Sequence, residues 1–188
     1  MERLPIDLEV IDRGNTLPID LQMKLCGPFS AKDIKEAIFL IPNLKSPGPD
    51  GFSSGFFKAT WHITGELVCN AIQQFFQSSY MPPFPRQTKL ILLPKVPNPT
   101  QVKDFWPISC CSVIYKCIAK LLCSRLKEVL PHLIQQPLGA FVKGRELLFN
   151  ILISQDIVRG YTRKGISPRC IMKIDLHKAF DSVRWGFI

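Results

Sequence analysis

The sequence predicts a helix-rich α+β fold, and three observations lead to that prediction. Apolar residues recur in pairs every four positions from Val113 to Leu130, as on the buried face of a helix. A short apolar run at residues 89–93 is typical of a buried strand. Residues 170–176 alternate apolar and polar side chains, which indicates a half-buried strand.

The composition is that of a globular protein with a basic surface. Hydrophobic residues make up 46% of the 188 residues and charged residues 21%, which excludes a disordered chain. Lysine and arginine number 24 against 15 acidic residues, so the net charge is +9 and the pI about 9.3. This excess fits a polyanionic partner, of which nucleic acid is commoner than a membrane surface; charge that serves solubility alone is the alternative.

Cysteine usage and the lack of apolar segments indicate the compartment. The seven cysteines form no C-x-x-C pair, so we expect buried free thiols in a reducing environment, not disulfides or a zinc site. No signal peptide is visible, and no apolar run approaches the ~20 residues that span a bilayer. We therefore expect a soluble intracellular protein, nuclear or cytoplasmic, with no membrane partner and no identifiable obligate protein partner.

The N-terminal third begins irregularly and then becomes helical. Residues 1–28 carry mixed charges and prolines, which predicts an irregular lead-in. Ser30 and Asp33 form a capping-box pattern ahead of a helix that ends before Pro42. The following loop, residues 45–51, is stiffened by prolines and bent by glycines. It is a simple connector or, through the flanking Lys45 and Lys58, a phosphate contact.

The middle of the chain predicts a helix, a turn and a hairpin. From Glu66 to Phe76, apolar pairs recur every four residues, as in an amphipathic helix. Prolines at 82–85 make a turn before the strand at 89–93. Residues 94–99 then form a rigid hairpin tip or, less ordinarily, a Pro-x-x-Pro ligand for a polyproline-binding module.

The helix at 113–130 has a basic face. The residues between its apolar pairs include Lys116, Lys120, Arg125 and Lys127, which indicates either a solvated face or one that follows a nucleic-acid backbone. Pro131 is expected to end this helix. A loop at 139–145 and another helix at 146–159 follow.

The strand at 170–176 places a carboxylate, Asp175, at its C-terminal end, ahead of a short helix from Lys178. Mg²⁺ prefers anionic oxygens and usually binds one or two protein carboxylates together with substrate phosphates. Phe180, five residues on, suits a site that positions metal and sugar together. The alternative is an exposed strand end with a helix-capping aspartate.

Five blocks of the chain, taken in order, closely resemble the reverse transcriptase of non-LTR (LINE-type) retrotransposons, with the character of plant elements. The resemblance extends from about Phe29 to Ile188. Its blocks are Lys45-Ser46-Pro47-Gly48-Pro49-Asp50-Gly51, Leu93-Pro94-Lys95, Pro107-Ile108-Ser109, Ala140-Phe141-Val142-Lys143-Gly144-Arg145 and Lys173-Ile174-Asp175 with Ala179-Phe180-Asp181.

The resemblance implies a partial right-hand polymerase. Residues 29–88 would be an N-terminal extension that lies over the template, 89–168 the fingers and 169–188 the start of the palm, truncated before the rest of the palm and the thumb. The implied activity is RNA-directed DNA polymerisation, a Mg²⁺-dependent nucleotidyl transfer with an RNA template and a DNA primer. The complete family enzyme uses two Mg²⁺ ions.

The resemblance also implies roles for single residues. Asp175 matches the first metal-binding catalytic aspartate, and Asp181 a structural position. Lys95 would lie near the triphosphate of the incoming nucleotide, and Phe180 would exclude a 2′-hydroxyl. Three basic residues of the shared blocks are the expected nucleic-acid contacts: Lys45, Lys143 and Arg145.

Three departures from the family pattern limit what the chain is expected to do. Trp106 stands where relatives have an arginine, which puts nucleotide binding in doubt because indole has one N–H and no charge. Leu138 replaces a glutamine, and the Tyr/Phe-x-Asp-Asp motif is absent. With Asp175 as the only palm carboxylate, two Mg²⁺ ions are doubtful here.

We expect an interrupted domain, without an endonuclease ahead of residue 30. This domain is expected to be inert as an isolated polymerase. The alternative is a non-catalytic, basic nucleic-acid-binding module.

Overall fold

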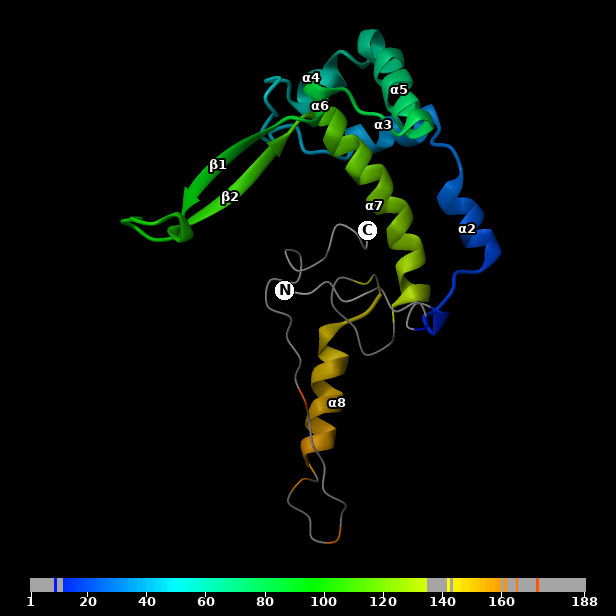
Figure 1. Ribbon diagram of the computed structural model, residues 1–188, viewed down its shortest axis with the longest axis vertical. Coiled ribbons are helices and arrows are strands. Elements are labelled where there is room, and N and C mark those ends of the chain that lie inside the picture. Colours follow the sequence, from blue (N-terminus) through cyan, green and yellow to red (C-terminus); the bar gives the residue numbers. More distant parts are fainter. Residues whose placement is uncertain are drawn as a thin grey trace. The chain divides into compact units, whose positions relative to one another are not determined.

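The computed structural model describes residues 9, 12–134, 142, 144–159, 161, 165 and 172, and the chain divides into two compact units. One unit is Pro18–Val129, and the other combines Met1–Leu17 with Leu130–Ile188. The described elements are mostly helices with one two-stranded antiparallel sheet, so the predicted helix-rich α+β character is confirmed (Figure 1). Within the described ranges, every helix is too short or too polar to cross a lipid bilayer.

Three helices build the core of the Pro18–Val129 unit: α3 (Ala31–Phe39), α5 (Trp61–Ser78) and α7 (Val113–Leu133). Their apolar stripes, visible as four-residue periodicity in the sequence, face one another and exclude water. This confirms the three predicted helices and their buried faces. The buried core residues are Phe29, Ile34, Ala37, Ile38, Val68, Cys69, Ile72, Cys117, Ile118 and Leu121.

The helix boundaries differ from the predicted ones where local signals are weak. α5 begins at Trp61, ahead of the first apolar pair, and is preceded by the short α4 (Ser54–Ala59). α7 continues through Pro131 to Leu133, so the prediction that Pro131 ends it is wrong. A proline in the last turn removes a single helical hydrogen bond. The Leu133 carbonyl, at the end of the helix, accepts a hydrogen bond from the Asn15 amide at 3.2 Å.

The predicted capping box at the start of α3 is present. The Ser30 hydroxyl accepts a hydrogen bond from the Asp33 N–H at 3.2 Å, and the Asp33 carboxylate accepts one from the Ser30 N–H at 2.8 Å. The Ser30 hydroxyl also donates to that carboxylate at 2.8 Å. These bonds, first from the Ser30 side chain and then from its backbone, hold the pKa of Asp33 below its ordinary value.

We expect Ser30→Ala to cost about 1 kcal/mol of stability at neutral pH. Because the folded-state pKa of Asp33 is lowered, its contribution is complete above the ordinary pKa of about 3.9 and is lost as the pH falls through the lower folded value. The gap between wild type and Ser30→Ala should therefore narrow below about pH 4. Urea unfolding from pH 7 downward, with exposed Lys127→Ala as the control, measures this. A gap that stays constant or widens in acid contradicts the assignment.

A helix replaces part of the irregular segment predicted for residues 1–28, so that prediction is wrong over α2 (Ile19–Cys26). Asp20 lies in its first turn and Lys24 in its last, where each complements the helix dipole. The Lys24 ammonium also pairs with the Glu128 carboxylate on α7 at 2.5 Å. This tertiary contact joins residues far apart in the chain, which no local pattern reveals.

The predicted hairpin is formed by β1 (Thr88–Pro94) and β2 (Phe105–Cys111). The strands are antiparallel and pair from Thr88 opposite Cys111 to Pro94 opposite Phe105. The single turn of α6 (Pro83–Arg86) precedes the hairpin, and a 3₁₀ turn at Val102–Asp104 precedes β2. Pro107 fits within β2 because a two-stranded sheet has edge positions that need no N–H donor.

The hairpin is exposed, which corrects the prediction of a buried strand at 89–93. Every residue of β1 is exposed, from Thr88 to Pro94. An apolar run predicts burial because continuous apolar strands usually lie between covered faces. In the described part of the chain, β1 pairs only with β2, and the hairpin extends away from the helices of its unit (Figure 1).

The six thiols that the structure describes are free, as predicted, but not uniformly buried. Cys69, Cys110 and Cys117 are buried, whereas Cys26 and Cys123 are exposed, contrary to the expectation of buried thiols. Burial raises the pKa of Cys117 to about 12, with smaller effects from neighbouring Cys69 and Lys120. Cys117 therefore remains a protonated, unreactive core residue at physiological pH.

The second unit contains α8 (Leu147–Arg159), which confirms the helix predicted at 146–159. Its described apolar side chains are largely exposed, including Leu148, Phe149 and Ile151. The predicted strand at 170–176 and the short helix from Lys178 lie outside the described residues, apart from Met172. The predicted boundaries at residues 88 and 168 stay predictions.

Candidate nucleic-acid interface

The register of the hairpin gathers apolar and basic side chains on one of its two faces. Residues paired across an antiparallel sheet share a face, and so do alternate residues along a strand. Leu93 pairs with Trp106, Ile91 with Ile108, and Lys89 with Cys110. We call this surface the Trp106 face; its exposed members are Lys89, Ile91, Leu93, Lys95, Trp106 and Ile108, and Cys110 is buried at its base.

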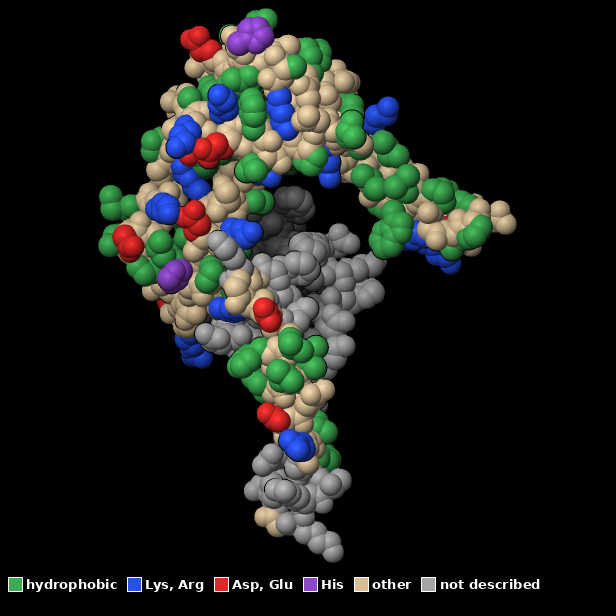
Figure 2. Space-filling view, turned by 180° about the vertical axis from the view of Figure 1, so that it is seen from behind, with side chains coloured by type: hydrophobic (Ala, Val, Ile, Leu, Met, Phe, Trp, Pro, Cys, Tyr) green, Lys and Arg blue, Asp and Glu red, His purple; other side chains and the backbone are tan. Residues whose placement is uncertain are grey.

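Most of the Trp106 face is open to solvent. The indole of Trp106 is 61% exposed, while Leu93 and Ile108 are 46% and 42% exposed. Figure 2 shows hydrophobic side chains along the hairpin, with basic side chains beside them. Exposed apolar surface of this kind, bordered by charge, is typical of a binding surface.

Lys95 is held at the tip of the hairpin by two contacts. Its ammonium donates to the Lys103 carbonyl oxygen at 2.9 Å and lies 4.2 Å from the centre of a Trp106 ring. Its backbone N–H donates to the Asp104 carbonyl at 2.7 Å. An ammonium has three N–H donors, so the bond to Lys103 leaves donors for an anionic ligand. The side chain is thereby restrained in place with its positive charge at the surface.

The proline–glycine loop is packed against the junction of β2 and α7. Gly48 is buried, and a Cβ atom there would lie 2.5 Å from the backbone nitrogen of Ser112. The Lys116 ammonium donates to the Ser46 carbonyl at 2.5 Å. Gly51 has a φ of +75°, which a glycine adopts without strain. The predicted stiff, bent loop is confirmed, and Lys45 lies exposed at its start.

Ser112 connects this loop to the rest of the unit. It is 2% exposed, and its hydroxyl donates to the Pro85 carbonyl at 2.8 Å. The same hydroxyl accepts a hydrogen bond from the Tyr115 N–H at 3.2 Å, as an N-cap does at the start of a helix. Ser112 thus joins the turn before β1, the end of β2 and the first turn of α7.

Lys58, the other lysine near the loop, has a structural role. Its ammonium donates to the Ile41 carbonyl at 2.6 Å and to the Asn43 side-chain oxygen at 2.7 Å. Cations favour the carbonyl groups at the C-terminal end of a helix, and Ile41 lies just after α3. A phosphate bound by Lys58 would have to displace these contacts.

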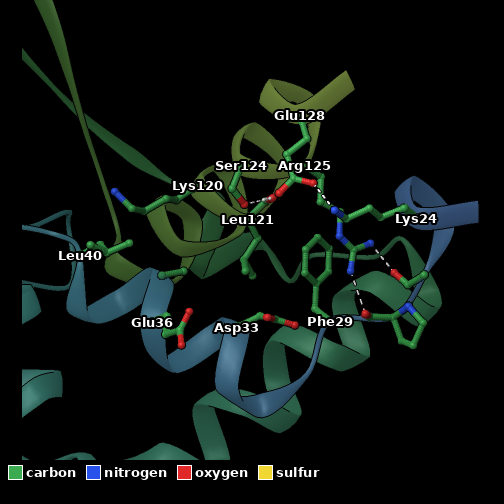
Figure 3. Close-up of a pocket in the computed structure, with 13 residues that line it drawn as sticks. Lys24, Phe29, Asp33, Glu36, Leu40, Lys120, Leu121, Ser124, Arg125 and Glu128 are labelled. Carbon is green, nitrogen blue, oxygen red and sulfur yellow. Dashed lines mark hydrogen bonds and ion pairs between the residues drawn. The ribbon is translucent and has the colours of Figure 1, made fainter. Parts of the chain in front are cut away.

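Arg125 binds the segment that joins α2 to α3. Its guanidinium donates to the carbonyl groups of Leu25 at 3.0 Å and Pro28 at 2.7 Å, and also to that of Gly27. The guanidinium carbon lies 3.3 Å from the ring centre of Phe29. Figure 3 shows Arg125 beside Phe29 at the wall of a cavity of about 490 Å³ between α3 and α7. The sequence analysis missed this role, since no local signal links residues about 100 positions apart.

The basic face of α7 is therefore partly used within the fold. Lys116 and Arg125 bind backbone carbonyl groups, Lys120 is half-buried beside the cavity, and Lys127 is exposed. Neither predicted interpretation, a solvated face or a nucleic-acid-tracking face, accounts for Lys116 and Arg125. Part of the chain's positive charge stabilises loops and helix ends.

The remaining predicted site residues lie in the other unit. Arg145 donates to the Pro131 carbonyl at 3.2 Å and the Ile134 carbonyl at 2.7 Å, at the end of α7. Lys143, Asp175 and Phe180 lie outside the described residues, as do Leu138 and Asp181. Among the described residues, no three His, Cys, Asp or Glu side chains form a metal-binding group. The roles predicted for these residues stay predictions.

Comparison with known proteins assigns the family. Residues 94–188, half of the chain, match the family model described as reverse transcriptase (RNA-dependent DNA polymerase). The chain is also similar to the transposon TX1 uncharacterized 149 kDa protein of Xenopus laevis, with 32% identity over 160 residues. That alignment covers 85% of this chain and 12% of the length of the relative. The matched region starts at Pro94 and includes Lys95, Trp106 and β2, and the chain therefore belongs to the reverse transcriptase family.

Proposed function

We propose that this chain is part of the RNA-directed DNA polymerase of a non-LTR retrotransposon, of the kind found in plants. The observation that carries the proposal is the exposed hairpin, whose tip and second strand lie in the family-matched region, with a restrained lysine, Lys95, at the tip. The similarity to a transposon protein supports the retrotransposon assignment. The five sequence blocks, in their order, support the non-LTR class.

In this proposal the chain forms the leading part of a right-hand polymerase. Residues 29–88 are the N-terminal extension, 89–168 the fingers and 169–188 the start of the palm. The packing of the proline–glycine loop against the β2–α7 junction supports an extension that works together with the fingers. The exposed face of the hairpin supports its assignment to a nucleotide- or template-facing surface.

The proposed chemistry is nucleotidyl transfer to a DNA primer. Asp175 is proposed to hold Mg²⁺, for which a carboxylate is a fitting ligand and which, when bound, neutralises charge on the reacting phosphates. Lys95 places a positive point charge toward the triphosphate. Phe180 is proposed to exclude the 2′-hydroxyl of a ribonucleotide by its bulk.

Lys45, Lys143 and Arg145 are proposed to contact the phosphate backbone of the template and primer. Lys45 is exposed and suits this role directly. Arg145 also binds the carbonyl groups at the end of α7, so a phosphate contact there competes with two existing hydrogen bonds. Its contribution to affinity should therefore be smaller than that of Lys45.

A non-catalytic nucleic-acid-binding module is the second candidate. It is favoured by Trp106, which stands in place of the family's arginine. The Lys95 ammonium lies over the Trp106 ring. Such a module would keep the basic and aromatic hairpin surface without the polymerisation step. Measuring binding and extension separately distinguishes the two candidates.

We expect the 188-residue chain to bind an RNA template annealed to a DNA primer, with an affinity that falls steeply with salt. If about four phosphates are contacted, affinity should drop roughly 100-fold between 50 and 200 mM salt. Lys45→Gln should reduce the salt slope by about 1, because one phosphate contact is lost. Fluorescence anisotropy at several salt concentrations measures both effects, with exposed Lys32→Gln as the control.

An extension assay on the same complex tests for the polymerisation step. Mg²⁺-dependent extension that Asp175→Ala abolishes supports the polymerase and shows that the chain is active by itself. Binding without extension is the result expected of the isolated chain, and it leaves nucleic-acid binding as the function that this chain performs alone. No affinity even at 50 mM salt contradicts both.

A further inference from the structure

We propose that the Trp106 face binds single-stranded nucleic acid, with one base stacked on the Trp106 indole and phosphates attracted to Lys89 and Lys95. This inference rests on the second candidate function, nucleic-acid binding by the hairpin surface. It specifies that surface and the kind of strand, and it assigns Lys95 to the phosphates of the strand instead of to an incoming triphosphate. It assigns to Trp106 a role that the family arginine does not have at this position.

Trp106 has the exposure and support that a stacking platform needs. The side chain is 61% exposed, although it is the largest apolar group on the hairpin. The Lys95 ammonium lies over the ring system at 4.2 Å and is itself fixed by the Lys103 carbonyl. A ring held in this way loses little freedom when a base stacks on it. Base–aromatic stacking tolerates any sequence because every base has a π face.

The length of the face favours a strand over a free nucleotide. Lys89 and Lys95 are six residues apart on the same face, which is about 20 Å along an extended chain. Between them lie the half-exposed Ile91, Leu93 and Ile108. Positive charge at both ends, with an apolar middle, matches a strand whose bases face the sheet and whose phosphates pass both lysines. One nucleotide would engage only part of this surface.

The substitution of tryptophan for arginine changes which part of the ligand is recognised. A guanidinium offers five N–H donors to phosphates, whereas an indole offers one N–H and a large flat surface. The contribution of Trp106 should therefore be insensitive to salt, while that of Lys95 should be salt-dependent. These two signatures distinguish stacking from charge.

The test uses the full 188-residue chain and a fluorescently labelled 15-nucleotide oligodeoxythymidine, followed by anisotropy from 50 to 300 mM salt. Trp106→Leu should weaken binding about 5- to 140-fold, the range for losing one stacked base, with an unchanged salt slope. Trp106→Phe should keep most of the affinity, because a ring remains. Lys95→Met should lower the salt slope by about 0.7, the value for one phosphate of a single strand.

Two controls isolate the face and the ligand. Leu92→Ala removes an exposed apolar side chain from the opposite face of the same hairpin and should leave binding unchanged. Excess thymidine triphosphate should not displace the oligonucleotide. Circular dichroism of each variant shows whether the fold is intact.

The outcomes separate this inference from the proposed function. If wild type binds the strand and Trp106→Leu binds equally well, stacking on Trp106 is wrong while nucleic-acid binding stands. Displacement of the strand by low concentrations of thymidine triphosphate would overturn the proposal in favour of a nucleotide site. If wild type binds neither the oligonucleotide nor the primer–template, the proposed function fails as well.

Discussion

Replacing Arg125 with leucine should destabilise the Pro18–Val129 unit by about 3–5 kcal/mol. The guanidinium satisfies the carbonyl groups of Leu25, Gly27 and Pro28 and packs on the ring of Phe29. A hydrogen bond from a charged donor contributes about 1.5–3 kcal/mol, and the values for bonds of one side chain are not additive. Leucine would keep part of the packing on Phe29 but would leave the carbonyl groups without this donor. Urea unfolding followed by circular dichroism measures the loss.

Two further variants show whether the cause is the guanidinium geometry. Arg125→Lys keeps the charge but not the planar fork, so it should recover less than half of the lost stability. Lys127→Leu removes an exposed cation from the same helix and should change stability by less than about 0.5 kcal/mol. If Arg125→Leu and Lys127→Leu change stability equally, the contacts of Arg125 do not stabilise the unit.

Replacing Gly48 with alanine should cost about 1–3 kcal/mol, the usual range for inserting atoms into a packed site. The new Cβ would lie 2.5 Å from the Ser112 nitrogen and 2.7 Å from the Cys111 carbonyl carbon. These are backbone atoms, which cannot move aside as a flexible side chain could. The loop must therefore separate from the β2–α7 junction, and the bond from Lys116 to Ser46 should weaken with it. Thermal unfolding and hydrogen exchange at residues 45–51 measure the two effects.

Gly55→Ala is the matched control, and its expected effect on stability has the opposite sign. Gly55 lies in α4, and its nearest neighbours would be 3.5 Å or more from the new Cβ, an ordinary contact. Because alanine is the better helix former, this variant should be neutral or more stable by up to about 1 kcal/mol. Equal losses at both positions would show that close packing is not what requires Gly48.

Elements with strong local signals were predictable from the sequence. The apolar periodicity of α3, α5 and α7 reflects a helix with one buried face, and that face is the core the structure contains. The capping box of Ser30 and Asp33 needs residues only three positions apart. The hairpin followed from two apolar runs that flank a proline-rich tip.

Features that depend on distant residues were not predictable. Arg125, Lys58 and Lys116 are ordinary surface cations by sequence, but each binds carbonyl groups at least 15 positions away. α2 forms where charges and prolines indicated irregular chain, and it is held by contacts with α7. The exposure of β1 was missed because an apolar run does not reveal how many strands will cover it.

The candidate site was predicted in part. The sequence placed Lys95 and Trp106 near each other on a hairpin but could not give the register that brings the ammonium over the indole. From the sequence, Trp106 is only the loss of an arginine, because the identity of a residue does not show what its side chain contacts.

The hydroxyl of Ser112 has a mechanical consequence for the hairpin. A rigid arm can pivot only at its base, and the base of this one is where Ser112 bonds to Pro85 and Tyr115 and touches Gly48. A strand that pulls on the tip would therefore strain the glycine loop and the start of α7 together with the arm.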